Sequence, residues 1–298
     1  MLEVKGIIAP IITPMNKDES IHLDEFRHQV DRLIENGIHG IFVFGTNGES
    51  YILSEEEKLE VIKVAVEQVA GRVPVYAGTG LNGTKETIRF SLRAKELGVD
   101  ALSIITPGFA AASQDELYEH FKEVAENVDL PIILYNIPAR TGNSIAPRTV
   151  GKLSHIPNIV GIKDSSGNFD TILQYIEQTR DVENFVVLSG NDSLILWTLL
   201  AGGAGAIAAC SNVYPYTMAQ IYEQFLAGDV EKSRQYQDSI RSFRDCFRFG
   251  NPNTIVKYGV AELGFPVGKA RAPFNKLSDE GIQALRQVMT ENKTKGMK

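Results

Sequence analysis

The chain has 298 residues, of which 43% are hydrophobic and 22% are charged, and its formal net charge at pH 7 is −7. A chain of this size can bury a large core without division into many domains. The negative charge argues against nucleic acid or an anionic membrane as the main partner, and we expect neither. Its two cysteines, Cys210 and Cys246, are too few for a disulfide framework or a zinc cluster. We therefore expect a reducing compartment and no metal site.

The start of the chain shows no secretory signal pattern, since a strand-like segment begins within its first residues. No apolar stretch approaches the ~20 residues that a membrane span requires. From these two features we expect a soluble, cytoplasmic protein.

Eight short apolar runs alternate with amphipathic segments along the chain. The runs cover residues 6–12, 40–44, 73–78, 101–105, 132–135, 159–162, 185–188 and 204–208. Two of the intervening segments begin with a capping box, Ser54 with Glu57 and Ser113 with Glu116. Eight hydrophobic strands, each followed by a helix, are typical of a (β/α)8 TIM barrel, an α/β fold. An open doubly wound sheet is the alternative. The number of runs and the lack of a Gly-x-Gly-x-x-Gly turn after the first run disfavour it.

Beyond the eighth run the pattern is helical to the end of the chain. Helical spacing of apolar residues covers residues 217–226, 230–247, 255–263 and 278–289. We predict a catalytic barrel over residues 1–225 and a C-terminal helical region over residues 226–298. The basic end of the chain, residues 293–298, is expected to be frayed.

Polar residues follow three of the predicted strands. Lys163 ends the sixth run, Tyr135 ends the fifth, and Gly45-Thr46-Asn47-Gly48-Glu49 follows the second. In a TIM barrel the catalytic groups gather at the C-terminal ends of the strands, so these features should face one cavity. A partly desolvated lysine there can attack a carbonyl to form a Schiff base. A solvated lysine at a strand end is the alternative for Lys163 alone, and the two other clusters disfavour it.

The residues around this lysine suit the chemistry of a small oxoacid. Successive N–H groups of residues 45–48 form a nest for a carboxylate, although an ordinary turn is the alternative. Tyr135 can pass protons if Thr46 supplies a hydrogen bond, or it can be a core tyrosine. Arg140, in the loop just beyond, is either solvated or the bidentate partner of a second carboxylate. Glu49 is expected to accept hydrogen bonds from nearby backbone rather than to act in catalysis.

Three motifs together resemble the dihydrodipicolinate synthase / N-acetylneuraminate lyase family of class I pyruvate-dependent aldolases. They are Gly-Thr-x-Gly-Glu at residues 45–49, Tyr-Asn-x-Pro-x-Arg-Thr-Gly at 135–142 and Gly-Ile-Lys-Asp at 161–164. The resemblance covers nearly the whole chain and includes Gly-Asn-Pro-Asn at residues 250–253, with Val256 and Lys257 after it. It is closest to the synthase branch, because Arg140 and the Thr-Gly after it fit that branch.

The resemblance implies a role for each residue of these motifs. Lys163 forms an imine with pyruvate, Tyr135 relays protons, and Thr46 orients the Tyr135 hydroxyl. Gly45, Asn47 and Gly48 hold the pyruvate carboxylate, with Asn47 where the family usually has threonine or serine. Arg140 binds the carboxylate of aspartate semialdehyde, and Ile207 lines the pyruvate pocket. No cofactor is required, the pathway is lysine biosynthesis, and a homotetramer built as a dimer of dimers is expected.

The chain departs from the synthase branch in one loop. Phe109 occupies the place of a tyrosine that, in the family, reaches into a neighbouring subunit's site. This change and the small residues 110–112 leave a second reading, a lyase or dehydratase of a 2-keto-3-deoxy sugar acid or an N-acetylneuraminate-type substrate. Asp192 could then bind a sugar hydroxyl. A non-catalytic ligand-binding homologue is a distant third reading, which the retained lysine and tyrosine disfavour.

The lysine-feedback site of the synthase branch is incomplete in this sequence. Ser50, Asn82 and Glu86 fit the site. The tyrosine expected at position 108 is a glycine, and Glu55 and Lys58 occupy positions often held by histidines. We therefore expect weak or no inhibition by lysine.

Overall fold

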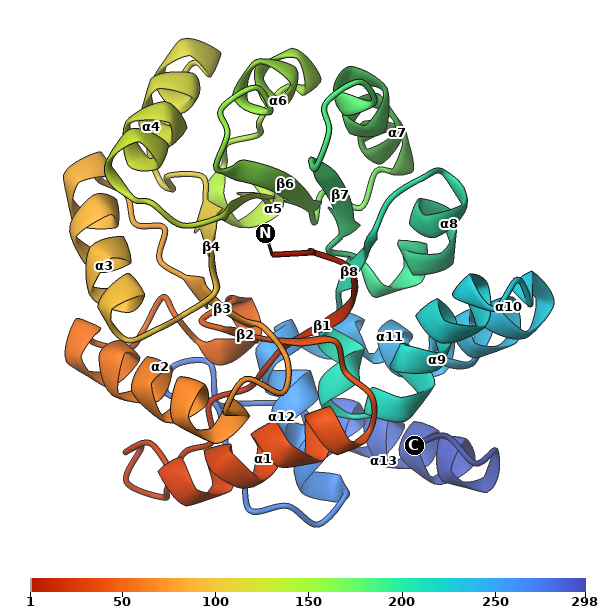
Figure 1. Cartoon of the computed structure of the whole chain (residues 1–298). Coiled ribbons are helices and arrows are strands. Elements are labelled where there is room, and N and C mark those ends of the chain that lie inside the picture. The colour runs from red at the N-terminus through yellow and green to blue at the C-terminus, as the bar shows by residue number, and fades with distance from the viewer. Residues whose placement is uncertain (1) are drawn as a thin grey trace.

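The structure is a computed structural model that describes residues 2–298. Its core is a sheet of eight parallel strands, β1 (Gly6–Pro10), β2 (Gly40–Val43), β3 (Val75–Gly78), β4 (Ala101–Ile105), β5 (Ile132–Asn136), β6 (Ile159–Asp164), β7 (Val186–Ser189) and β8 (Gly205–Ile207). The strands pair in sequence order, and β1 pairs with β8 to close the barrel (Figure 1). The predicted (β/α)8 barrel is confirmed.

Helices surround the barrel and continue beyond it (Figure 1). They are α1 (Leu23–Glu35), α2 (Glu55–Val69), α3 (Thr84–Glu96), α4 (Gln114–Asn127), α5 (Pro138–Thr141), α6 (Pro147–Leu153), α7 (Phe169–Thr179), α8 (Ile195–Leu200), α9 (Pro215–Leu226), α10 (Val230–Ser239), α11 (Arg241–Asp245), α12 (Pro252–Glu262) and α13 (Asp279–Thr294). Short 3₁₀ turns occur at η1 (Thr46–Gly48), η2 (Asp192–Leu194), η3 (Ala209–Asn212) and η4 (Cys246–Phe249). None of the helices within residues 2–298 is long and apolar enough to cross a membrane.

Both predicted capping boxes are present. The Ser54 side chain accepts a hydrogen bond from the Glu57 amide and the Glu57 carboxylate accepts one from the Ser54 amide, and Ser113 and Glu116 do the same. These contacts satisfy amide donors that the first helical turn leaves free. They fix where α2 and α4 start, and therefore where the loops after β2 and β4 must end.

Apolar side chains that point into the barrel fill its interior. Nine buried residues form this inner cluster: Val4, Ile8, Phe42, Tyr76, Ala101, Ile133, Val160, Leu188 and Ile207. Because side chains alternate between the two faces of a strand, Tyr135, two positions after Ile133 on β5, also points inward. The pairing of β5 with β6 shifts register between Ile132 and Ile133, so that Gly161 lies beside Ile133 and Lys163 lies beside Tyr135.

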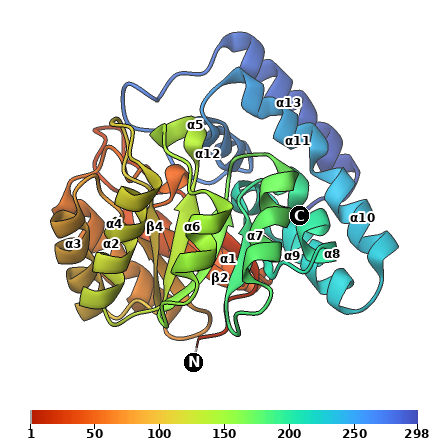
Figure 2. The ribbon, with the colours of Figure 1, turned by 90° about the horizontal axis from the view of Figure 1, so that it is seen from above.

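The C-terminal helices approach the open end of the barrel. Figure 2 shows α5 and α12 at the end of the barrel opposite the start of the chain, with α13 above them. The expected division between residues 225 and 226 falls at the end of α9 and stays a prediction. The single helix expected over 230–247 is wrong, because the chain divides at Ile240 into α10, α11 and η4.

The last residues are bonded to the body of the protein. The Thr217 amide donates to the Lys298 carbonyl at 2.8 Å, and the Lys298 amide donates to the Thr217 hydroxyl at 3.2 Å. The prediction of a frayed end over residues 293–298 is therefore wrong. The composition of this end gave no sign that its backbone would find a partner on α9.

Candidate active site

Lys163 lies inside β6 and faces the interior of the barrel. In the sheet register it stands beside Tyr135 of β5. The Nζ atom lies 3.9 Å from the centroid of the Tyr135 ring and 5.3 Å from that of Phe42, and the residue is only 4% exposed. None of the ion pairs within residues 2–298 includes Lys163. Aromatic faces, rather than a carboxylate, therefore surround this amine.

Asp164 follows Lys163 but serves the opposite face of the strand. Its carboxylate accepts hydrogen bonds from the Asn136 amide at 2.7 Å and from the Ser166 hydroxyl at 2.6 Å. Burial raises the pKa of Asp164, and these hydrogen bonds act against that rise. The acid ties the ends of β5 and β6 together and leaves the amine free to react.

Tyr135 connects the lysine to the loop after β2. Its hydroxyl lies 3.4 Å from the Thr46 hydroxyl. Burial favours the neutral phenol, but the positive charge of Lys163 and the hydrogen bonds from Thr46, Ser165 and Lys163 outweigh it, so the pKa of Tyr135 is lowered. A phenol with a lowered pKa exchanges its proton more readily near neutral pH.

The loop after β2 forms the expected turn. The Gly48 amide donates to the Gly45 carbonyl at 3.0 Å, and the Glu49 amide donates to the Thr46 carbonyl at 3.2 Å. The amides of Thr46 and Asn47 have no acceptor among residues 2–298. These two free donors lie at the start of the 3₁₀ turn, which suits a carboxylate. A side chain at Gly45 would bring Cβ within 2.8 Å of the Phe42 ring, so glycine allows this close packing.

A cavity of about 480 Å³ opens at the C-terminal ends of the strands. Thr46 and Tyr135 line it, and so does Arg140. Its lining contains two cationic side chains, those of Lys58 and Arg140, and no carboxylate within the described residues. In a chain of net charge −7, a cavity with this lining is suited to anions.

Arg140 lies in α5 at the edge of this cavity, beside the start of α12. Its Nη1 atom donates to Asn251 Oδ1 at 3.1 Å. Tyr51 and Asn253 also line this side of the cavity, and Asn253 Nδ2 is buried without a hydrogen-bond partner in the described chain. Burial and the Glu49 charge raise the pKa of Tyr51 to about 12, although Arg140 acts against them.

Several residues of this cavity were missed from the sequence. Tyr51, Ser103 and Asn253 each line it. The Gly-Asn-Pro-Asn motif formed part of the family resemblance, but nothing in the sequence places α12 over the barrel. Ser103 could not be recognised as a cavity residue from the sequence, because a serine within a strand more often has no role in binding.

Of the candidate residues, Thr46, Tyr135 and Arg140 line the cavity, and Lys163 contacts Tyr135 from behind the lining. Two others, Ile207 and Asp192, are held in different surroundings. Ile207 is packed in the inner cluster of the barrel beside Ile8 and is not among the cavity-lining residues. Asp192 is buried, accepts a hydrogen bond from the Cys210 amide at 3.0 Å and lies 3.6 Å from Arg244. Burial raises the pKa of Asp192, and Arg244 acts against the rise. Asp192 is thus occupied by partners of its own chain.

The loop after β4 points its aromatic residue away from the cavity. Phe109 is fully exposed and has a φ of 73°, a conformation that is unusual for a bulky residue. Asn143 holds the loop through hydrogen bonds to the carbonyls of Pro107 and Ala110 and from the amide of Ala112. In one copy of the chain, Phe109 therefore does not close the site.

A closed barrel that presents a buried lysine beside a tyrosine and a threonine belongs to an enzyme that works through a lysine Schiff base. The sequence profile of the dihydrodipicolinate synthetase family matches residues 3–292, and the chain belongs to this family.

The similarity to other proteins extends over nearly the whole chain. The chain is 40% identical over 291 residues to the 4-hydroxy-tetrahydrodipicolinate synthase of Methanoculleus marisnigri, covering 97% of this chain and 99% of that protein. The crystal structure of dihydrodipicolinate synthase from Thermotoga maritima is similar with a TM-score of 0.95 and 31% identity, over 98% and 99% of the two chains. A prophage protein of the family from E. coli K12, solved in complex with pyruvate, has a TM-score of 0.93 and 31% identity over 97% and 98%.

Proposed function

We propose that the chain condenses pyruvate with aspartate semialdehyde to form 4-hydroxy-tetrahydrodipicolinate and water. The observation that carries this proposal is the contact of Lys163 with Tyr135, which lines a cavity together with Arg140 and with no carboxylate from residues 2–298. The relative from Methanoculleus marisnigri carries the name of this activity, and the E. coli relative is described with pyruvate.

The reaction begins at Lys163. Its neutral amine adds to the C2 carbonyl of pyruvate, and loss of water leaves an imine. The free amides of Thr46 and Asn47 hold the pyruvate carboxylate, with Gly45 and Gly48 shaping the turn. The protonated imine withdraws electrons from C3, so C3 loses a proton and an enamine forms.

Tyr135 moves the protons of these steps. It takes part in the loss of water and of the C3 proton, because the amine lies over its ring and its hydroxyl is within hydrogen-bond reach of Thr46. The enamine carbon then attacks the aldehyde carbon, forming a carbon–carbon bond, and the aldehyde oxygen takes up a proton. Arg140, at the edge of the cavity, binds the carboxylate of the aldehyde substrate.

Ring closure releases the product from Lys163. The amino group of the aspartate semialdehyde part adds to the imine carbon and expels the Lys163 amine. One carbon–nitrogen bond forms and another breaks, so the enzyme regains its free lysine. The water lost on imine formation is the only by-product, and no oxidant or reductant is consumed.

Cleavage of a 2-keto-3-deoxy acid is the second candidate. Phe109 supports it, because a phenyl ring cannot pass a proton and the loop leaves the mouth open. The same lysine imine would then form from the longer acid, and a retro-aldol step would release an aldehyde. Arg140 favours the condensation, since a neutral sugar hydroxyl does not require a guanidinium.

We further propose that the chain forms a homotetramer, located in the cytoplasm. A fully exposed phenylalanine at the mouth supports association, because burial of its ring against a second copy would be favourable. The two cysteines are free and buried, which fits a reducing compartment. Sedimentation equilibrium would measure the assembly, and a monomer at micromolar concentration would refute it.

Reductive trapping tests the proposed activity. Borohydride added with pyruvate should attach a three-carbon acid covalently to Lys163, detected by peptide mass spectrometry. The Lys163→Arg variant should give no adduct. Turnover of aspartate semialdehyde is then compared with cleavage of a panel of 2-keto-3-deoxy acids. Labelling together with faster turnover of a sugar acid would favour the second candidate, and no labelling would refute both.

A further inference from the structure

Glu49, which closes the turn after β2, forms a buried ion pair with a residue of the C-terminal region. Glu49 directly follows Gly48, and its Oε1 atom contacts Lys257 Nζ of α12. Both side chains are 0% exposed. Lys257 also donates to the Lys269 carbonyl at 3.1 Å, so its own position is fixed.

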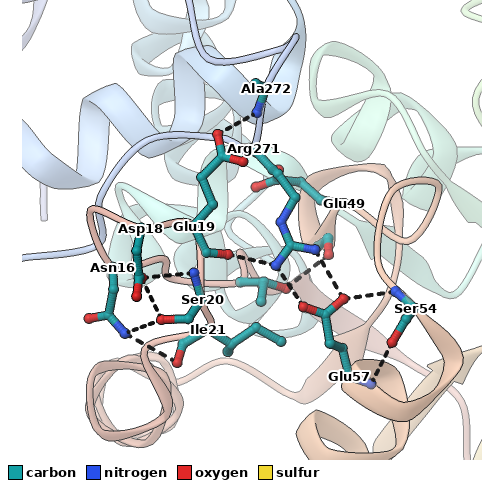
Figure 3. A network of polar contacts seen from close by, with 12 residues as sticks. Asn16, Asp18, Glu19, Ser20, Ile21, Glu49, Ser54, Glu57, Arg271 and Ala272 are labelled. Atoms are coloured by element: carbon teal, nitrogen blue, oxygen red, sulfur yellow. Dashed lines mark hydrogen bonds and ion pairs between the residues drawn. The ribbon is translucent and has the colours of Figure 1, made fainter.

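A second contact joins Glu49 to the segment that precedes α13. The Arg271 amide donates to Glu49 Oε2 at 2.8 Å, while the Arg271 guanidinium donates to both carboxylate oxygens of Glu57 at 3.0 and 2.7 Å. It also donates to the Glu19 carbonyl at 2.6 Å, and Glu19 Oε1 accepts from the Ala272 amide (Figure 3). One residue, Arg271, thus holds the end of the turn and the first turn of α2 together.

The backbone of Glu49 requires such support. Its φ is 60° and its ψ is 33°, a left-handed conformation that a residue with a side chain adopts at a cost. The Glu49 amide closes the 3₁₀ turn on the Thr46 carbonyl, and Thr13 holds the carbonyl of Gly48 at 2.8 Å. If the carboxylate of Glu49 lost its anchors, this residue could return to a commoner conformation. The free amides of Thr46 and Asn47 would then lose their common direction.

We propose that Lys257 and Arg271 are positioning residues for the pyruvate carboxylate, acting through Glu49. The inference rests on the proposed function, since it takes the carboxylate of pyruvate as the ligand of the turn. It assigns to the C-terminal region a part in substrate binding, although Lys257 does not line the cavity.

A purely structural role is the alternative. A buried ion pair often adds little net stability, because the cost of removing both charges from water offsets their attraction. Removing one partner is destabilising, because the other charge stays buried and unpaired. Loss of stability alone therefore does not separate the two roles, and the affinity for pyruvate must be measured beside it.

The experiment compares four proteins: the wild type, Lys257→Met, the double variant Glu49→Gln with Lys257→Met, and Arg244→Met. The last is the matched control, because Arg244 also joins the C-terminal region to a buried carboxylate, that of Asp192, outside the cavity lining. For each we would measure KM for pyruvate, KM for the aldehyde, kcat, the pyruvate dependence of borohydride labelling, and the urea midpoint of unfolding.

We expect Lys257→Met to raise KM for pyruvate by about tenfold or more, with kcat and the aldehyde KM changed by less than about threefold. The double variant should recover the urea midpoint, because no unpaired charge remains, while its KM for pyruvate stays raised. Arg244→Met should lower the urea midpoint without a selective change in KM. If Lys257→Met does not fold, the double variant decides the question.

Three results would overturn the inference. These are an unchanged KM for pyruvate in the double variant, recovery of this KM together with the urea midpoint, or an equal rise in Arg244→Met. Failure of pyruvate to label the wild type would refute the proposed function, and the inference would fall with it. If pyruvate labels the wild type normally and KM for pyruvate is unchanged in the variants, the inference is refuted and the proposed function is not.

Discussion

The Lys163 Nζ atom lies over the ring of Tyr135, 3.9 Å from its centroid, while the hydroxyl of the same ring is 3.4 Å from that of Thr46. The ring face of Tyr135 therefore contacts the Lys163 amine, while its hydroxyl lies within hydrogen-bond reach of the Thr46 hydroxyl. The aromatic face packs against the amine without placing a negative charge beside it. The site consequently keeps its attraction for an anionic oxoacid.

Tyr135 should produce an alkaline limb in the activity. Its pKa is lowered from 10.0, so kcat/KM should decline with an apparent pKa below 10.0 as the phenol loses its proton. The Thr46→Val variant removes a hydrogen bond that lowers this pKa, so its limb should move to higher pH. Tyr135→Phe should reduce kcat by roughly 10²–10⁴ and abolish the limb. A limb that is unchanged in Tyr135→Phe would show that another group titrates.

Arg140 should discriminate between aldehyde substrates. Arg140→Ala removes the cation at the edge of the cavity, and loss of a charge-assisted contact of ~1.5–3 kcal/mol should raise KM for aspartate semialdehyde about 10–100-fold. The KM for pyruvate should not change, because its carboxylate is assigned to the turn after β2. A neutral aldehyde of similar size serves as the control and should be indifferent to the substitution. Equal losses for both aldehydes would refute the assignment.

The sequence predicted the part of the site that strand ends determine. Lys163, Tyr135 and Thr46 could be brought together in advance, because the parallel strands of a barrel all end on one side. The inward direction of Lys163 could not, since it depends on the register shift between β5 and β6. The role of Ile207 in lining the pyruvate pocket stays a prediction. It lies on β8 beside Ile8, in the inner cluster that also contains the cavity-lining Phe42.

Contacts made by the C-terminal region could not be predicted. Glu49 was expected to bond to nearby backbone, yet its partners are Lys257 and the amide of Arg271, far along the chain. A buried lysine within a helix has no local signature, since its charge is matched only by tertiary structure. Asp192 was considered as a ligand of a sugar hydroxyl because the sequence does not show that Arg244 lies 3.6 Å from its carboxylate.

Lysine should inhibit weakly or not at all. Lys58 lines an arm of the cavity together with Ser50 and Asn82, and no ion pair of its ammonium occurs within residues 2–298. Burial lowers the pKa of Lys58, while Glu55 and Glu57 act against this. Glu55 is itself bound to Arg89 and Arg93. A cationic ligand would therefore meet a cation here.

The measurement is the initial rate of condensation at increasing lysine concentration, for the wild type and for Lys58→Met. We expect no inhibition of the wild type at millimolar lysine. Any inhibition that does occur should be stronger in Lys58→Met, because the repelling charge is gone. Inhibition of the wild type at micromolar lysine would refute the prediction.

His120 should make the free energy of unfolding depend on pH below neutrality. It is buried on α4, bonded to the Thr84 hydroxyl at 2.9 Å, and burial lowers its pKa below 6.5. As pH falls through 6.5, the unfolded chain binds a proton that the folded chain does not, so stability falls until the folded pKa is reached. Urea unfolding over this range should show a smaller fall for His120→Gln than for the wild type. The exposed residue His155 provides the control, because His155→Gln should keep the wild-type dependence. Equal slopes for the wild type and His120→Gln would show that the acid sensitivity has another origin.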